Sequence, residues 1–138
     1  MFHKVMKANE LQIGDYVNYR GQIIKVTSLY DKGGSNEVGW SEKESVWVNA
    51  DNVEPIPLTS KILEKNGFKV TRNISSSRNK DVWSLHVSKY KIFYITEHHN
   101  KKMFPYFWIE IGSNSDIKYV HQLQHALRLC GITREIII

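Results

Sequence analysis

One long helical pattern, at residues 120–130, follows a chain whose other ordered segments resemble mostly short strands. At 100° per residue, its apolar positions share one arc of a helix. These positions are Val120, Leu123, Ala126, Leu127 and Cys130. Gly131 then stands where a left-handed C-cap ends a helix. Because a helix with one apolar arc packs against a sheet when strands precede it, the pattern predicts an α+β fold.

Residues 1–58 predict a small SH3-like β-barrel. Two alternating segments, 15–19 and 22–29, are joined at Arg20-Gly21, a pair typical of a tight hairpin turn. The phrase L-x-x-G-D-x-V at residues 11–17 is common in such barrels. We expect a flexible loop at 31–37, short strands at 38–40, 45–48 and 53–54, and a turn of 3₁₀-helix at 49–52.

Residues 59–138 predict an α+β layer of two helices on an antiparallel sheet. Pro55 and Pro57 form a short rigid connector before it, and Thr59 is a good N-cap for a helix that ends near residue 66. We expect strands at 68–73, 82–88, 91–97 and 104–111, the helix at 120–130, and a last strand at 132–138. The two domains, 1–58 and 59–138, are expected to pack together as one compact unit.

The positive charge of the chain is concentrated in its middle third. The net charge is +5, and residues 59–102 hold ten Lys and Arg against three Asp and Glu, whereas residues 1–58 hold six against eight. Such asymmetry indicates an anionic partner. The cations expected to contact phosphates are Arg72, Arg78, Lys80, Lys101 and Lys102.

Aromatic residues crowd the strands of the second half. With period-2 alternation, Phe107, Ile109 and Ile111 share one face of the strand at 104–111, and its opposite face presents Tyr106 and Trp108. The opposite face of the neighbouring strand, at 91–97, presents Tyr94. Two apolar faces are typical of a sheet buried on both sides, so burial tendencies favour a face covered by the barrel or by another subunit. The alternative is an exposed platform on which unpaired bases stack.

The polar side of the helix at 120–130 has three interpretations. It carries His121, Gln124, His125 and Arg128. Composition favours a solvated face. Recognition of phosphates, bases or a protein is the second interpretation, since these side chains offer paired donors. Two histidines at i and i+4 also suit a metal, but Gln122 stands where a zinc peptidase needs glutamate, so no metal is expected.

Catalysis is not expected. The sequence contains no nucleophile elbow, phosphate loop or dinucleotide fingerprint, and its scattered acids suit turns. No cofactor is therefore expected. The single cysteine, Cys130, is expected to be buried and unreactive. No run of about 18 apolar residues and no signal-peptide pattern occurs, so we expect a cytoplasmic protein without membrane contact, monomeric or weakly dimeric.

Three blocks of sequence resemble a known family. They are residues 8–17 (A-N-E-L-Q-I-G-D-Y-V), residues 53–68 (beginning V-E-P-I-P-L-T) and residues 119–124 (Y-V-H-Q-L-Q). Together they are similar to small hypothetical proteins of Bacteroides-type gut bacteria and of their prophages and mobile elements. The resemblance implies a bacterial, phage-linked cytoplasmic protein, and it transfers no site residues.

These observations favour a non-enzymatic binding protein, an accessory of phage or mobile-element origin that contacts nucleic acid through residues 59–102. The alternative is a protein–protein interaction module, which uses the barrel or the polar helix face and binds no nucleic acid.

Overall fold

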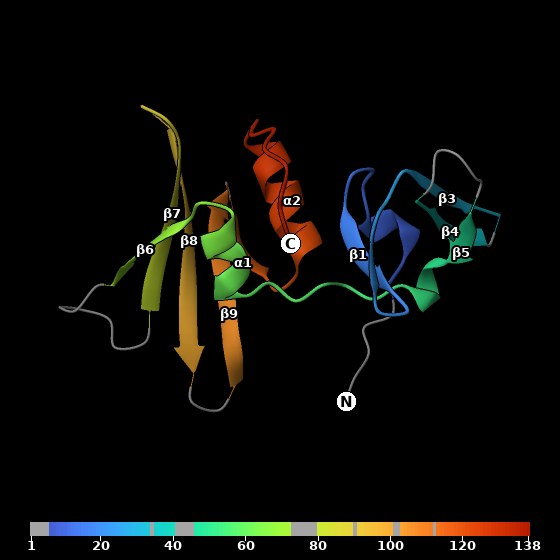
Figure 1. Cartoon of the computed structure of the whole chain (residues 1–138), viewed down its shortest axis with the longest axis horizontal. Coiled ribbons are helices and arrows are strands. Elements are labelled where there is room, and N and C mark those ends of the chain that lie inside the picture. The colour runs from blue at the N-terminus through green and yellow to red at the C-terminus, as the bar shows by residue number, and fades with distance from the viewer. Residues whose placement is uncertain are drawn as a thin grey trace. The chain divides into compact units, whose positions relative to one another are not determined.

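A computed structural model describes residues 6–33, 35–40, 46–72, 80–89, 91–100, 103–111 and 113–138, and Figure 1 shows their arrangement. Within these residues the chain forms two α-helices and three antiparallel sheets, which confirms the α+β prediction. The first half contains η1 (Ala8–Glu10), β1 (Tyr16–Tyr19), β2 (Gln22–Lys25), β3 (Ser28–Lys32), β4 (Ser35–Gly39), β5 (Trp47–Asn49) and η2 (Ala50–Asn52). The second half contains α1 (Ser60–Lys65), β6 (Lys69–Arg72), β7 (Lys80–Ser88), β8 (Lys91–Asn100), β9 (Met103–Ile111), β10 (Ser113–Ile117) and α2 (Val120–Leu129).

The elements group into two units that do not simply follow chain order. Unit 1 comprises Met1–Pro57 and Tyr119–His125, and unit 2 comprises Leu58–Lys118 and Ala126–Ile138. The first half of α2 therefore belongs with the N-terminal strands, although the sequence grouped the whole helix with residues 59–138.

The hairpin of β1 and β2 has the turn that its sequence predicts. Tyr19 pairs with Gln22, so the loop is two residues long. Both loop residues have positive φ, 49° at Arg20 and 81° at Gly21. Two successive positive φ values match the right-handed twist of the strands, and glycine accepts the second without steric cost.

The strands β3, β4 and β5 form a separate three-stranded sheet. The flexible loop expected at 31–37 is wrong, because β3 extends to Lys32 and pairs there with Ser35 at the start of β4. The 3₁₀ turn is confirmed as η2, and the Asn49 side chain caps it by accepting from the Asp51 amide. The described residues form no closed barrel, so the SH3-like barrel is not confirmed.

Backbone hydrogen bonds extend the two small sheets of unit 1 to the residues that flank them. The Val26 amide donates to Asp15 and the Thr27 amide donates to Gly39, both at 2.8 Å. Asn18 and Glu54 exchange two further bonds as an isolated bridge. One core lies between these strands, made of Met6, Leu11, Val17, Ile24, Val26, Val38, Ala50 and Val53.

In unit 2, α1 begins where its sequence predicts. The Thr59 hydroxyl accepts from the Ile62 amide at 3.3 Å, which satisfies one of the free amides of the first turn. Gly67 follows the helix at φ 86°, and a Cβ there would lie 2.9 Å from the Arg134 guanidinium. The positive φ of the turn therefore favours glycine, whereas the Arg134 side chain could move aside from a Cβ.

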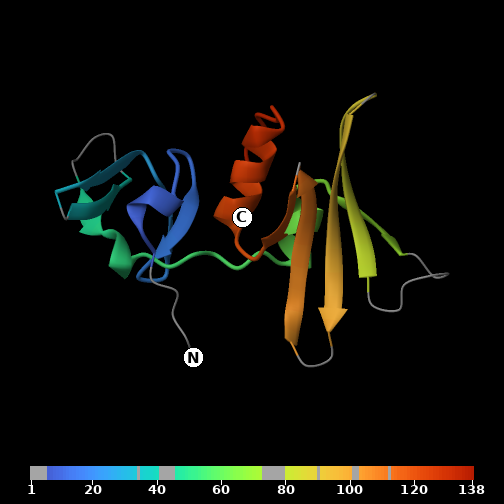
Figure 2. The same cartoon turned by 180° about the vertical axis from the view of Figure 1, so that it is seen from behind.

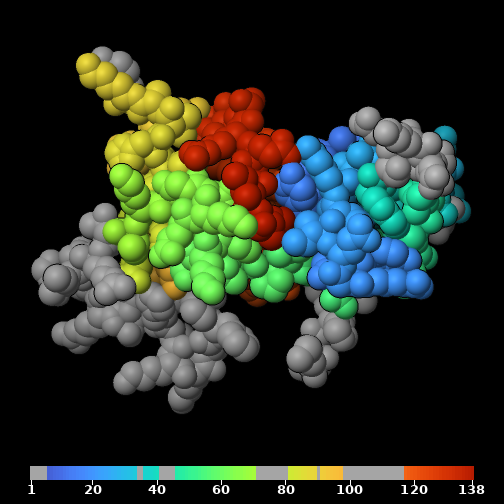
Figure 3. All heavy atoms as spheres, in the orientation of Figure 1, coloured from blue at the N-terminus to red at the C-terminus, as the bar shows by residue number. Residues whose placement is uncertain are grey.

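The sheet of unit 2 has the strand order β10-β9-β8-β7-β6. One face of its central strands is core, with Trp83, Leu85, Phe93 and Ile95 buried. Phe68, just after α1, packs edge-on against Phe93 with ring centroids 6.3 Å apart, so the α1 segment lies against this face (Figure 1). Space-filling atoms show the residues around α1 on this side of unit 2, with the β7–β8 hairpin projecting beyond them (Figure 3).

The C-terminal segment is held by side chains and is not the strand that the sequence predicts. The side-chain amide of Asn66 forms two hydrogen bonds with Ile137, each at 2.7 Å. Its Oδ1 accepts from the Ile137 N–H, and its Nδ2 donates to the Ile137 carbonyl. Lys65 donates to the Ile138 carbonyl at 3.0 Å. These bonds from the end of α1 replace strand pairing for residues 132–138.

Candidate nucleic-acid interface

The polar side of α2 is not the solvated face that its composition favoured. His121 and Gln124 are only 2% and 6% exposed, and His125 keeps a quarter of its side chain in solvent. All three belong to unit 1, where residues about 110 positions earlier in the chain contact two of them. The expectation of an open face is therefore wrong for His121 and Gln124, because both side chains are buried.

Asp15 is the polar centre of this arrangement and is fully buried. Its Oδ2 atom accepts from the Gln12 amide at 2.7 Å and lies 2.5 Å from Nε2 of His125. Burying a carboxylate is costly unless donors surround it. The two donors offset this cost and join the loop before β1 to the helix.

Gln124 forms a second link between the same two segments. Its Nε2 donates to the Gly14 carbonyl and its Oε1 accepts from the Tyr16 amide, both at 2.9 Å. The side-chain amide thus pairs with the backbone on both sides of Asp15. Gly14 has φ 96°, a conformation that favours glycine.

Aromatic contacts fill the rest of this side of the helix. Tyr119 stacks on His121 with ring centroids 5.7 Å apart, and His121 meets His125 edge-on at 5.6 Å. Among the described residues no group of three or more His, Cys, Asp or Glu is arranged to hold a metal ion. The contacts assign the His121, Gln124 and His125 side chains to packing.

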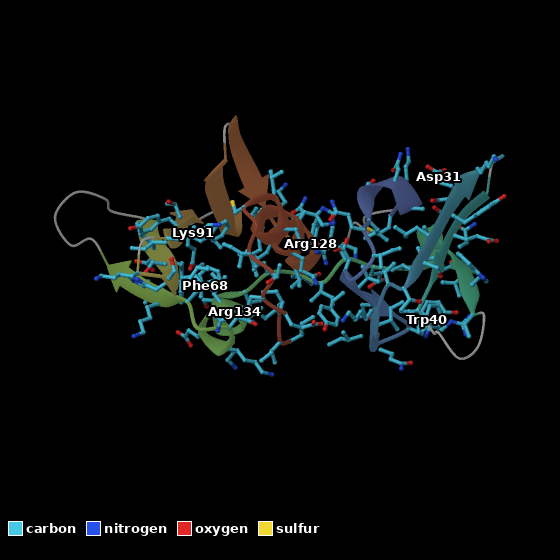
Figure 4. The ribbon with its side chains drawn as sticks, turned by 90° about the horizontal axis from the view of Figure 1, so that it is seen from above. Asp31, Trp40, Phe68, Lys91, Arg128 and Arg134 are labelled. Carbon is cyan, nitrogen blue, oxygen red and sulfur yellow. The ribbon has the colours of Figure 1, made fainter. Side chains whose placement is uncertain are left out.

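The end of α2 lies in unit 2. Arg128 in its last turn is half-buried, and Figure 4 shows it on the helix. Lys91 of β8 donates to the Cys130 carbonyl, so a side chain satisfies one of the free acceptors of the helix end. Cys130 itself is half-buried, whereas the sequence predicted a buried position.

The outer face of β7 and β8 is open where the side chains are described. Tyr94 is 55% exposed and Ile92 is 37% exposed. Phe93 and Ile95, which alternate with them along β8, are buried on the other face. Tyr94 and Ile92 are thus accessible in this chain, and the expectation that the barrel or another subunit covers the second face stays a prediction. Figure 2 shows the sheet from the side away from α1.

Tyr94 stands in a cross-strand row with a lysine. The register pairs Lys69 of β6 with Ser84 of β7, and Ser84 with Tyr94 of β8. Directly paired residues share a face of the sheet, so the three side chains lie on the outer face. Lys69 is exposed and Ser84 is half-buried. The next row along the strands pairs His86 with Ile92, and both of these residues are exposed.

The same register extends this face toward other residues predicted as sites. Trp108 pairs with Thr96, and Tyr106 and Lys80 both pair with His98, so all three occupy positions of the Tyr94 parity. Arg72 pairs with Asp81 and has the opposite parity. Backbone alone is described at these four positions, and Arg78, Lys101 and Lys102 lie outside the described residues.

Lys69, Ser84 and His86 were not predicted as site residues. The signal that identifies them is the pairing register, since each lies on the Tyr94 face only because β6 and β7 align with β8 in this way. Period-2 alternation gave the parity within each strand, but it did not give the alignment between strands.

No family model, no curated protein and no solved structure matches the chain. In the part of the chain that the structure describes, neither helix has the length and apolar character needed to cross a membrane.

Proposed function

We propose that the protein is a non-enzymatic binding protein whose unit 2 contacts nucleic acid through the outer face of β6, β7 and β8. The observation that carries the proposal is the row of Lys69, Ser84 and Tyr94, which places an exposed cation and an exposed aromatic ring on one face. We also propose a phage or mobile-element accessory role, with an SH3-like arrangement of the strands in unit 1.

The charge of the two units supports an anionic partner for unit 2. The segments of unit 2 hold thirteen Lys and Arg against six Asp and Glu, a net +7, whereas those of unit 1 hold six against eight, a net −2. Phosphates supply much of the affinity in protein–nucleic acid complexes, and cations on one surface attract them.

Fluorescence anisotropy with labelled oligonucleotides at low salt tests the proposal. Binding is expected, and for three or four phosphate contacts to a single strand it should weaken about tenfold or more between roughly 50 and 200 mM salt. At a fixed low salt concentration, Lys69→Glu should bind the oligonucleotide more weakly than wild type does. Lys32→Glu, at an exposed strand lysine of unit 1, makes the same change of net charge and should have a smaller effect.

Two results would contradict the proposal. The first is no binding to single-stranded or duplex probes at low salt. The second is equal loss of affinity in Lys69→Glu and Lys32→Glu, because net charge alone would then explain the binding.

A second function, that of a protein–protein module, has its own supporting observation in unit 1. Tyr30 and Trp47 are 45% and 42% exposed, and the register places them on one face of the β3–β4–β5 sheet. Glu37 pairs with Tyr30 on that face. Exposed aromatic residues are enriched in protein interfaces, and the acidic unit suits a basic segment of the partner protein.

A nuclease-treated pull-down compares the two functions. A basic partner protein that survives nuclease treatment, is lost with the double variant Tyr30→Ala/Trp47→Ala and is kept by Tyr94→Ala would support the module. Retention of that partner by the double variant would exclude this face.

A further inference from the structure

We infer that the nucleic acid bound by unit 2 is single-stranded and that an unpaired base stacks on Tyr94. This inference rests on the proposed function and narrows its ligand class. It also names the outer face of β7 and β8 as the surface that meets the bases, with Tyr94, Ile92, Ser84, His86 and Lys69 as the contacting side chains.

The exposed ring is the first reason. A tyrosine on a sheet keeps its ring in contact with neighbouring strands, yet Tyr94 has more than half of its surface in solvent. Ile92 lies two residues earlier on the same face and gives the ring an apolar neighbour. An aromatic ring on a flat sheet accepts a base of any identity, because every base presents a π-face.

The position of the lysine is the second reason. Lys69 and Tyr94 lie in one row with Ser84 between them, so about 10 Å of sheet separates their backbones. A base can stack on the Tyr94 ring while the phosphate backbone of the same strand runs toward β6. The phosphate would then lie near Lys69, so the strand would contact both side chains. His86 adds an exposed ring that can bond with base edges, whereas the Ser84 hydroxyl donates to the Lys69 carbonyl at 3.4 Å and is left with its acceptor capacity.

Duplex is the poorer fit to this surface. The bases of a duplex are paired and stacked inside it, so a ring on a broad sheet cannot reach their faces. Readers of the duplex major groove insert a helix or a two-stranded ribbon instead. A protein partner would gain little here, because the exposed apolar residues described on this face are Ile92 and Tyr94, and Lys69, Ser84 and His86 surround them with polar groups.

Four labelled probes test the inference by anisotropy at one low salt concentration. They are oligothymidine of about 12 nucleotides, the corresponding oligouridine, a duplex of the same length, and an abasic strand with the same phosphates. Wild type should bind oligothymidine or oligouridine about tenfold more tightly than the duplex and the abasic strand. The tighter of the first two is the preferred single strand for the comparisons below.

The variants separate stacking from charge. Tyr94→Ala should lose about tenfold in affinity for the preferred single strand and change little toward the abasic strand. Tyr94→Phe keeps the ring and should bind as wild type does. Tyr30→Ala, at an exposed strand tyrosine of unit 1, is the matched control and should also bind as wild type does.

The outcomes distinguish the inference from the proposed function. Binding of the duplex or the abasic strand as tight as that of the preferred single strand overturns the inference and leaves the proposed function standing. If Tyr94→Ala binds the single strand as tightly as wild type does, the inference is likewise overturned and the proposed function still stands. No binding of any probe overturns both.

Discussion

The polar side of α2 and the outer face of β7 and β8 both combine polar and aromatic residues, but they differ in what surrounds those residues. On α2, Gln124 and His125 meet Gly14, Asp15 and Tyr16 within unit 1. On the sheet, Tyr94 is half exposed and its row contains a lysine with solvent access.

The difference separates a structural surface from a binding surface. A side chain whose donors and acceptors are bonded inside the fold cannot offer them to a ligand without losing stability. An exposed ring costs little to cover, and covering it with a base adds stacking energy. Mutations should therefore reduce stability on α2 and affinity on the sheet.

The largest loss of stability is expected from Asp15→Ala. It removes the acceptor of the Gln12 amide and the partner of His125 at a fully buried position. The free energy of unfolding should fall by about 3 kcal/mol, because the Gln12 amide and the His125 ring both lose their hydrogen-bond partner. Urea unfolding measures the change. Asp31→Ala, at an exposed carboxylate, is the control. An equal loss of unfolding free energy in the two variants would contradict the structural role of Asp15.

A somewhat smaller loss is expected from Gln124→Ala. The variant leaves the Gly14 carbonyl and the Tyr16 amide without their side-chain partner, at about 1 kcal/mol for each bond and more for a buried group left unsatisfied. A decrease of about 2 kcal/mol in unfolding free energy is expected by urea titration. Gln22→Ala, at an exposed position of β2, should be near neutral. A neutral Gln124→Ala would mean that α2 is not anchored by this residue.

A similar but more local effect is expected in unit 2 from Asn66→Ala. Asn66 is buried and holds Ile137 through two bonds, so its loss should free the C-terminal segment at a cost of about 2 kcal/mol. Hydrogen exchange of the Ile137 amide should become faster, whereas Asn52→Ala at an exposed site should leave it unchanged. Unchanged exchange in Asn66→Ala would show that other contacts hold the segment.

The smallest change in stability is expected from Tyr94→Ala. Because the ring is more than half exposed, its removal should lower the unfolding free energy by about 0.5 to 1 kcal/mol, below the effect of Gln124→Ala. Urea unfolding of both variants under one condition gives the comparison. A loss as large as that of Gln124→Ala would indicate that the outer face of the sheet is packed rather than open.

Local patterns predicted elements better than they predicted what covers them. The Arg20-Gly21 turn, the Thr59 cap and the helix ending near Gly131 depend on neighbouring residues, and each is present. The burial of Gln124 depends on a segment about 110 residues away, which no local pattern reports. Likewise, alternation gave the parity of Tyr94, but the Lys69 partner required the strand register.

A titration of ¹⁵N-labelled protein with oligothymidine or oligouridine, whichever binds more tightly, tests the central claim most directly. The backbone amide signals of Ser84, Ile92 and Tyr94 should move as the strand is added. Those of Tyr16 and the Gln124 side chain should remain in place, because they stay bonded within unit 1. Shifts centred on residues 12–16 and 119–125, with the β7 and β8 signals unmoved, would contradict the assignment of the two faces.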